Sequence, residues 1–223
     1  AEIAGGSLDA SARLSEVWGA SSVLSTVLQS NLVCQEIAVS SPLELPTSEK
    51  PPDQLLRSVV RQLTRSPGMD CRAQVALLHL LCVWTWECPR ASEGCLSEPS
   101  TVVFLAGVMK GREEDAPEFA RKHAMGAAAL LAACCLVSSE DEQLCQGVFS
   151  IIESRVGLDR FEDLLEGFSS SPSVLSAKKR ELSLVPHKAP PEDAQWGYSV
   201  CDAEIATIAE LAGQALQKVL FKL

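Results

Sequence analysis

The chain has 223 residues, of which 47% are hydrophobic and 22% charged, as expected for a folded protein that can bury a sizeable core. Its 29 acidic and 19 basic residues give a net charge of -10, which argues against a general nucleic-acid surface because phosphate binding needs a basic field. The net charge does not exclude a local basic patch.

The nine cysteines are odd in number and lie within apolar runs. This pattern predicts reduced core thiols of a cytosolic protein rather than a disulfide framework. No signal peptide opens the sequence, and the first residue, Ala1, suggests a fragment of a longer protein. The most lipid-like stretch, Ala124 to Val137, is too short to span a bilayer.

Apolar residues at helical spacing predict a helix from Leu8 to Leu28 and a short helix from Leu32 to Val39. The proline-rich segment from Ser40 to Pro52 has no periodicity and is expected to be a surface loop. Helical spacing resumes at Asp53, the expected cap, and continues through Arg65.

The next helix is the expected centre of the fold. It begins after its N-cap, Asp70, and cannot continue beyond Cys88 because Pro89 follows. Almost every position from Val75 to Trp86 is apolar, so other helices must surround it. Trp84 and Trp86 are therefore candidate core residues.

The second half of the chain contains further helical segments. Ser139 and Glu142 form a predicted capping box, and Gly157 is expected to end the helix that follows it. An alanine-rich helix is expected to be the second buried element. The predicted segments are Pro89 to Leu96, Thr101 to Lys110, Pro117 to Val137, Ser139 to Val156, Leu158 to Phe168, Ser173 to Leu184 and Asp202 to Lys222.

No segment alternates apolar and polar residues in the manner of a strand, so the fold class is predicted to be all-α. About ten helices fit a bundle or a solenoid of stacked helical hairpins, and the alternation of amphipathic and fully apolar helices favours the solenoid. No repeated sequence supports that choice. We expect a helical domain over residues 1–184, a proline-rich linker over 185–199 and a closing helix over 200–223, which packs on the body or leads into a coiled coil.

Candidate chemistry is sparse. Cys82, Cys88 and Cys95 with His79 could be imagined as zinc ligands, but no CxxC pair occurs, so packing is the preferred interpretation and no metal or cofactor is predicted. Cys134 and Cys135 are adjacent and should pack on different sides of their helix. A nucleophile at Cys88 or Cys95 is disfavoured because no histidine lies in a catalytic context, and no phosphate-binding glycine motif occurs.

Two further groups of residues have competing interpretations. The basic run Lys178, Lys179 and Arg180 is more typical of a solvated helix face than of a lipid or nucleic-acid contact. Trp196 and Tyr198, in the predicted linker, either anchor it to the body or are exposed for a partner.

Three stretches of the sequence resemble one family: Cys71 to Met109, Leu144 to Phe168 and Tyr198 to Leu220. They are similar to the globular head of the general vesicular transport factor family, which acts in traffic between the endoplasmic reticulum and the Golgi. In the second stretch, Ile152, Arg155, Gly157, Phe161 and Leu165 match a motif of that family. The alanine-rich helix, the loop from Pro42 to Pro52 and the pair Cys201 and Asp202 depart from the family pattern.

The resemblance implies an armadillo/HEAT-like α-solenoid, here the C-terminal part of a longer head, without catalysis. It also implies a homodimer through a coiled coil in the full-length protein, a peripheral location on Golgi and vesicle membranes, and Rab-type GTPases, SNAREs and other Golgi tethers as partners.

The function hypothesis is a non-enzymatic vesicle-tethering module. The candidate partner-binding residues are those of one exposed ridge, for which a merely solvated helix face is the competing interpretation: Arg155, Asp159, Arg160, Glu162 and Asp163. Two alternatives are a helical scaffold or small-GTPase regulator unrelated to tethering, and an enzyme built around Cys88 or Cys95.

Overall fold

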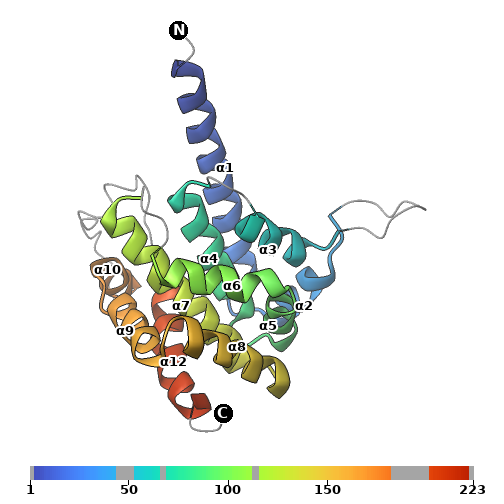
Figure 1. Ribbon diagram of the computed structural model, residues 1–223. Helices are drawn as coiled ribbons and strands as arrows, with labels where there is room; N and C mark the ends of the chain where they lie inside the picture. The colour runs from blue at the N-terminus through green and yellow to red at the C-terminus, as the bar shows by residue number, and fades with distance from the viewer. Residues whose placement is uncertain (1–2, 44–52, 66–68, 112–115, 182–200, 221–223) are drawn as a thin grey trace.

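The computed structural model describes residues 3–43, 53–65, 69–111, 116–181 and 201–220, and these segments are helical throughout apart from connecting turns (Figure 1). A single isolated bridge joins Pro42 and Gln54 within this part of the chain. The all-α prediction is confirmed, and the arrangement is consistent with an α-solenoid. The helices are α1 Ile3–Leu28, α2 Leu32–Ser40, α3 Leu55–Arg65, α4 Cys71–Thr85, α5 Pro89–Leu96, α6 Pro99–Met109, α7 Glu118–Ser138, α8 Glu142–Arg155, α9 Leu158–Ser169, α10 Pro172–Glu181 and α12 Ala203–Leu220.

Helices α4 and α7 form the core of the molecule. They pack on each other, α1 also covers α4, and α6, α9 and α12 cover α7. Every residue from Ala73 to Thr85 is buried, and so is nearly all of α7 beyond Ala124. The predicted interior positions of Trp84 and Ala128 are confirmed, since both are fully buried.

Helix α7 is also the one helix in the described residues that is long and apolar enough to cross a membrane. Of its most apolar window, 78% is buried inside the protein. Because other helices already occupy the faces that lipid would contact, α7 serves here as a core helix.

Helix α4 ends earlier than the sequence predicted. Its last residue is Thr85, and Trp86 is extended, with a ψ of 122°. Glu87 adopts a φ of 57°, and Cys88 is extended as the residue before Pro89. A proline disfavours the helical conformation in the residue before it, which explains why the break precedes Cys88.

The start of α4 agrees with the prediction. The Asp70 carboxylate accepts a hydrogen bond of 2.8 Å from the backbone N–H of Arg72 and also binds the Arg72 guanidinium. The hydrogen bond from the Arg72 side chain is the main reason that the pKa of Asp70 lies below its usual value. Asp70 therefore caps the central helix in its charged form.

Replacing Asp70 with alanine is expected to lower the free energy of unfolding by about 1 kcal/mol, the usual effect of losing an N-cap. Because the folded-state pKa is lowered, this contribution is present above the unfolded-state value near 3.8 and is lost as the pH falls through the folded-state value. Urea denaturation at pH 7 and at pH 3 measures both effects. Asp70→Asn is the control, because asparagine keeps the cap without the titration. An equal loss in both variants at pH 7 would contradict the capping role.

The predicted capping box at the start of α8 is wrong. Asp141, not Ser139, is the N-cap of α8, and its carboxylate accepts a hydrogen bond from the Leu144 N–H. Ser139 ends α7 instead, and its hydroxyl accepts a hydrogen bond from the Asp141 N–H. Gly157 does end α8 as predicted, with a φ of 89° that favours glycine and an N–H bonded to the Ile152 carbonyl.

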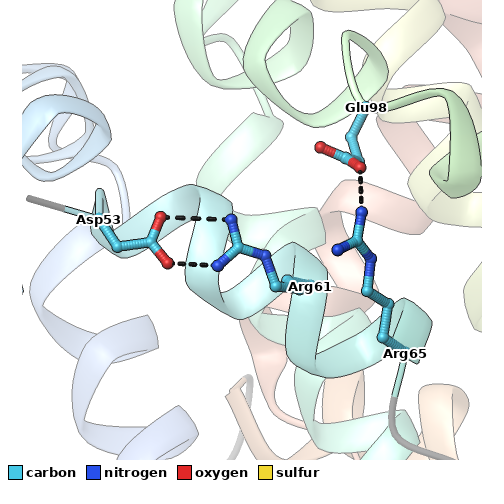
Figure 2. A network of polar contacts seen from close by, with 4 residues as sticks. All are labelled: Asp53, Arg61, Arg65 and Glu98. Atoms are coloured by element: carbon cyan, nitrogen blue, oxygen red, sulfur yellow. Dashed lines mark hydrogen bonds and ion pairs between the residues drawn. The ribbon is translucent and has the colours of Figure 1, made fainter. Parts of the chain in front are cut away.

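Asp53 was the predicted cap of α3, but it lies two residues before the first helical residue. Its carboxylate is bound instead by the guanidinium of Arg61, in the middle of α3 (Figure 2). One turn later, Arg65 donates to the Glu98 carboxylate at 2.8 Å (Figure 2). These two arginines connect α3 to the segment before it and to the start of α6.

Helix α2 is fixed to α4 by reciprocal hydrogen bonds. The Trp84 indole N–H donates to the Gln35 carbonyl at 3.1 Å, and the Gln35 side-chain amide donates to the Val83 carbonyl at 2.9 Å. Gln35 is itself buried. This pairing satisfies polar groups that burial would otherwise penalise, and it fixes how α2 sits on the core.

The closing helix α12 packs back on the body, where it contacts α4, α7, α9 and α10. The side-chain amide of Gln29, just after α1, donates to Glu204 at 3.0 Å, and Lys178 on α10 forms an ion pair of 2.7 Å with Glu210. The linker predicted over 185–199, with Trp196 and Tyr198, lies outside the described residues.

Candidate functional site

The predicted ridge lies at the end of α8 and along the outer side of α9. All five of its residues are exposed: Arg155, Asp159, Arg160, Glu162 and Asp163. Helix α9 presents them because Phe161, Leu165 and Phe168 recur at helical spacing and bury the opposite side. Asp159 lies in the first turn of α9, where its negative charge interacts favourably with the helix dipole and stabilises the helix.

The five residues do not have equal freedom to contact a partner. The Arg160 guanidinium donates two hydrogen bonds, of 3.4 and 3.2 Å, to the Met109 carbonyl at the end of α6. Arg160 therefore helps to attach α9 to α6. The three carboxylates of Asp159, Glu162 and Asp163 make this ridge predominantly acidic.

Asp163 also lines a groove that the sequence did not predict. The groove has a volume of about 700 Å³ and lies between α7, α9 and the start of α10. Its apolar residues are Phe119, Met125, Leu164 and Phe168, and its other lining residues are Glu118, Lys122, His123, Asp163, Gly167, Ser170, Ser171 and Pro172. Carboxylates and a lysine around an apolar floor are a composition suited to binding a peptide or side chain.

The rim of the groove carries an ion pair between Lys122 and Glu118, one helical turn apart on α7, at 2.8 Å. The hydrogen bond from Lys122 lowers the pKa of Glu118. Both side chains are exposed, so the pair sets the charge pattern of the rim rather than the stability of α7.

A second, smaller hollow of about 450 Å³ lies where the turn after α4 meets the end of α7 and α12. Trp86 forms part of its wall together with Val137 and Leu211. Trp86 is thus only partly buried, unlike Trp84, and its predicted place in the core is correct only in part.

Several large apolar side chains are exposed on the last turns of α1 and on α2. Val23, Val33 and Ile37 expose 65%, 65% and 62% of their surface, and Val27 and Leu32 are also exposed. Val23 and Val27 are one turn apart on α1, and Val33 and Ile37 are one turn apart on α2. The exposure of these residues was not identified from the sequence, which predicted only that they lie in helices.

Neither of the two candidate catalytic cysteines, Cys88 and Cys95, is accessible as a nucleophile. Seven of the nine cysteines are buried, including Cys88 and Cys95, on which the enzyme alternative depended. Burial raises the pKa of the Cys88 thiol, which keeps it protonated and unreactive at neutral pH. Cys134 faces Cys82 on α4 whereas Cys135 faces Cys95 on α5, as expected for adjacent residues on different sides of α7.

The structure does not bring together the four residues considered as zinc ligands, Cys82, Cys88, Cys95 and His79. His79 instead lies beside His123 of α7, with a distance of 3.3 Å between their Nε2 atoms, and Cys201 lies beside His123. The phenyl ring of Phe168 packs against both imidazoles. This cluster joins three segments of the chain that are distant in sequence, which is why residue spacing did not reveal it.

Residues 7–194 match the family described as Uso1 / p115 like vesicle tethering protein, head region. General vesicular transport factor p115 of Homo sapiens is 28% identical over 212 residues, which cover 92% of this chain and 20% of the human protein. Golgin candidate 6 of Arabidopsis thaliana is 27% identical over 172 residues, covering 69% of this chain and 18% of the plant protein. The chain thus spans about a fifth of the length of these relatives.

Proposed function

Because the chain belongs to the Uso1/p115-like vesicle tethering proteins, as part of their head region, we propose that it forms a non-enzymatic docking surface for the capture of transport vesicles. The family match over residues 7–194 is the observation that carries this proposal. The buried core of α4 and α7 supports it, because a rigid helical body holds exposed residues in fixed positions for partners.

The proposed architecture is an armadillo/HEAT-like α-solenoid over residues 1–184, followed by a linker and a closing helix. Support comes from the enclosure of α4 and α7 by the helices packed around them, as when helical hairpins stack. In the full-length protein, the closing helix would lead towards a coiled coil that forms a homodimer. Two heads on one dimer would increase the effective affinity for a membrane that displays several partners.

The proposed route is traffic from the endoplasmic reticulum to the Golgi and within the Golgi, with a cytoplasmic, peripheral location on these membranes. The names of the relatives, a vesicular transport factor and a golgin, support this proposal. Membrane association would come from protein partners, for which Rab-type GTPases, SNAREs and other Golgi tethers are the proposed classes.

The ridge of α8 and α9 is the proposed partner contact. Its carboxylates at Asp159, Glu162 and Asp163 are exposed and give it an acidic character, and Asp163 connects it to the groove between α7 and α9. A partner with a lysine- or arginine-rich surface would be complementary, and such pairing chiefly raises the association rate. Arg155 and Arg160 would contribute to the choice between partners.

Charge reversal of Asp159, Glu162 and Asp163 to lysine in the longer protein is expected to reduce vesicle capture at least about threefold, because it opposes a basic partner. The thermal unfolding midpoint should fall only slightly, since each surface substitution usually changes stability by no more than about 0.5 kcal/mol and only Asp159 lies in the first turn of a helix. Vesicle co-sedimentation and thermal denaturation measure the two effects.

The matched control reverses three exposed acidic residues on other elements: Glu16, Glu87 and Glu140. It changes the net charge equally, so it isolates the position of the charges from their number. Unchanged capture by the ridge variant, or equal loss in the control, would remove the ridge as the docking site without testing the tethering function itself.

A further inference from the structure

The cluster of His79, His123 and Cys201 has the geometry of a metal site. The two Nε2 atoms are 3.3 Å apart, the Cys201 Sγ lies 3.8 Å from the His123 Nε2, and all three donor atoms lie within 4.8 Å of one another. All three residues are buried, with exposed fractions of 8%, 8% and 0%. They come from α4, from α7 and from the position two residues before α12.

We propose that His79, His123 and Cys201 bind one Zn²⁺ ion. A tetrahedral zinc ion with usual Zn–N and Zn–S bonds places two ligand nitrogens about 3.3 Å apart and a nitrogen and a sulfur about 3.5 Å apart. Two of the distances found here are 3.3 and 3.8 Å, and the third, from Cys201 to His79, lies within 4.8 Å, so the Cys201 thiol would move towards His79 to bring all three donors onto one ion. Imidazole and thiolate donors favour zinc over calcium or magnesium, which prefer oxygen.

An apolar side chain borders the two histidine ligands. The Phe168 ring lies against both imidazoles, with centroid distances of 6.1 Å to His79 and 5.0 Å to His123. An apolar shell of this kind strengthens the attraction between a cation and its ligands.

The fourth position of the tetrahedron belongs to a water molecule or to a group that enters from the groove, because His123 is part of the groove wall. The ion would connect the closing helix to both core helices through ligands 44 and 78 residues apart. The metal site would then hold α12 against α4 and α7. Without metal, the same side chains would be a hydrogen-bonded pair of imidazoles beside a packed thiol.

The test is a titration of the chelator-treated full chain with Co²⁺, a spectroscopic substitute for Zn²⁺, followed by Zn²⁺ competition. We expect one equivalent of Co²⁺ to bind with a thiolate charge-transfer band, Zn²⁺ to displace it, and Zn²⁺ to raise the thermal unfolding midpoint. Cys201→Ser should abolish the band and weaken binding by at least about 100-fold, because losing a ligand costs more than losing an outer-shell partner, which costs about 10- to 100-fold. His79→Gln should keep the band but weaken binding similarly.

Cys145→Ser is the control, because Cys145 is also a buried thiol but belongs to α8, outside the cluster. It should bind Co²⁺ as the wild type does, which separates the site from adventitious binding by other thiols. The absence of a thiolate band in folded wild-type protein would overturn the proposal, and so would equal binding by Cys201→Ser. The wild-type titration is decisive even if a variant does not fold, with folding checked by circular dichroism.

Discussion

Replacement of Trp84 by alanine is expected to lower the free energy of unfolding by about 3–5 kcal/mol, the largest effect of any single substitution considered for this chain. Trp84 has an exposed fraction of 0% and lies at the end of α4 where α2 packs on it. The substitution leaves a cavity in the core, and it also leaves the Gln35 carbonyl without its indole donor.

Two further variants separate these causes. Trp84→Phe fills most of the volume but cannot donate a hydrogen bond, so a loss of about 0.5–1.5 kcal/mol is expected from the missing bond to the Gln35 carbonyl. Trp86→Ala is the matched control, because Trp86 is only half-buried and lines a hollow, and its loss should be clearly smaller than that of Trp84. Urea denaturation followed by circular dichroism measures all three. A loss below about 1 kcal/mol for Trp84→Ala would contradict its place in the core.

Replacement of Gly126 by alanine is expected to destabilise the protein by about 1–3 kcal/mol through overpacking between α7 and α9. A Cβ atom at this position would lie 2.7 Å from the Cβ of Phe168 and 2.6 Å from its Cδ2. Rotation of the ring cannot relieve the contact with Phe168 Cβ, so α9 itself would have to move away from α7. The groove between the two helices should change with it.

Gly147→Ala is the control for this substitution. Gly147 also lies inside a helix, α8, but no neighbouring atom lies within 4 Å of the place that an alanine methyl group would take. Alanine should therefore stabilise the protein by up to about 1 kcal/mol through its higher helix propensity. Chemical denaturation of both variants tests the difference in sign. If Gly126→Ala were as stable as Gly147→Ala, the close approach of α7 and α9 would be wrong.

The sequence was enough to place most residues of the candidate surface on a helix, but not to predict what those residues contact. The amphipathic pattern of α9 predicted that Asp159, Glu162 and Asp163 are exposed, and the structure confirms it. The same pattern could not indicate that Arg160 binds the Met109 carbonyl or that Asp163 borders a groove. Those contacts depend on α6 and α7, whose positions relative to α9 are not encoded in its own periodicity.

The order of residues along the chain was enough to predict the helices and which of them are interior. Apolar spacing marked α4 and α7 as buried, and local chemistry placed the Asp70 cap and the turn at Gly157, because each depends on residues a few positions apart. The caps of α3 and α8 and the last residues of α4 were not predicted correctly, because several nearby residues could have taken those roles. Contacts between side chains of different helices emerged from the folded structure alone. His79, His123 and Cys201 come together because α4, α7 and the start of α12 cross at one place, and that crossing depends on the packing of whole helix faces rather than on any local spacing.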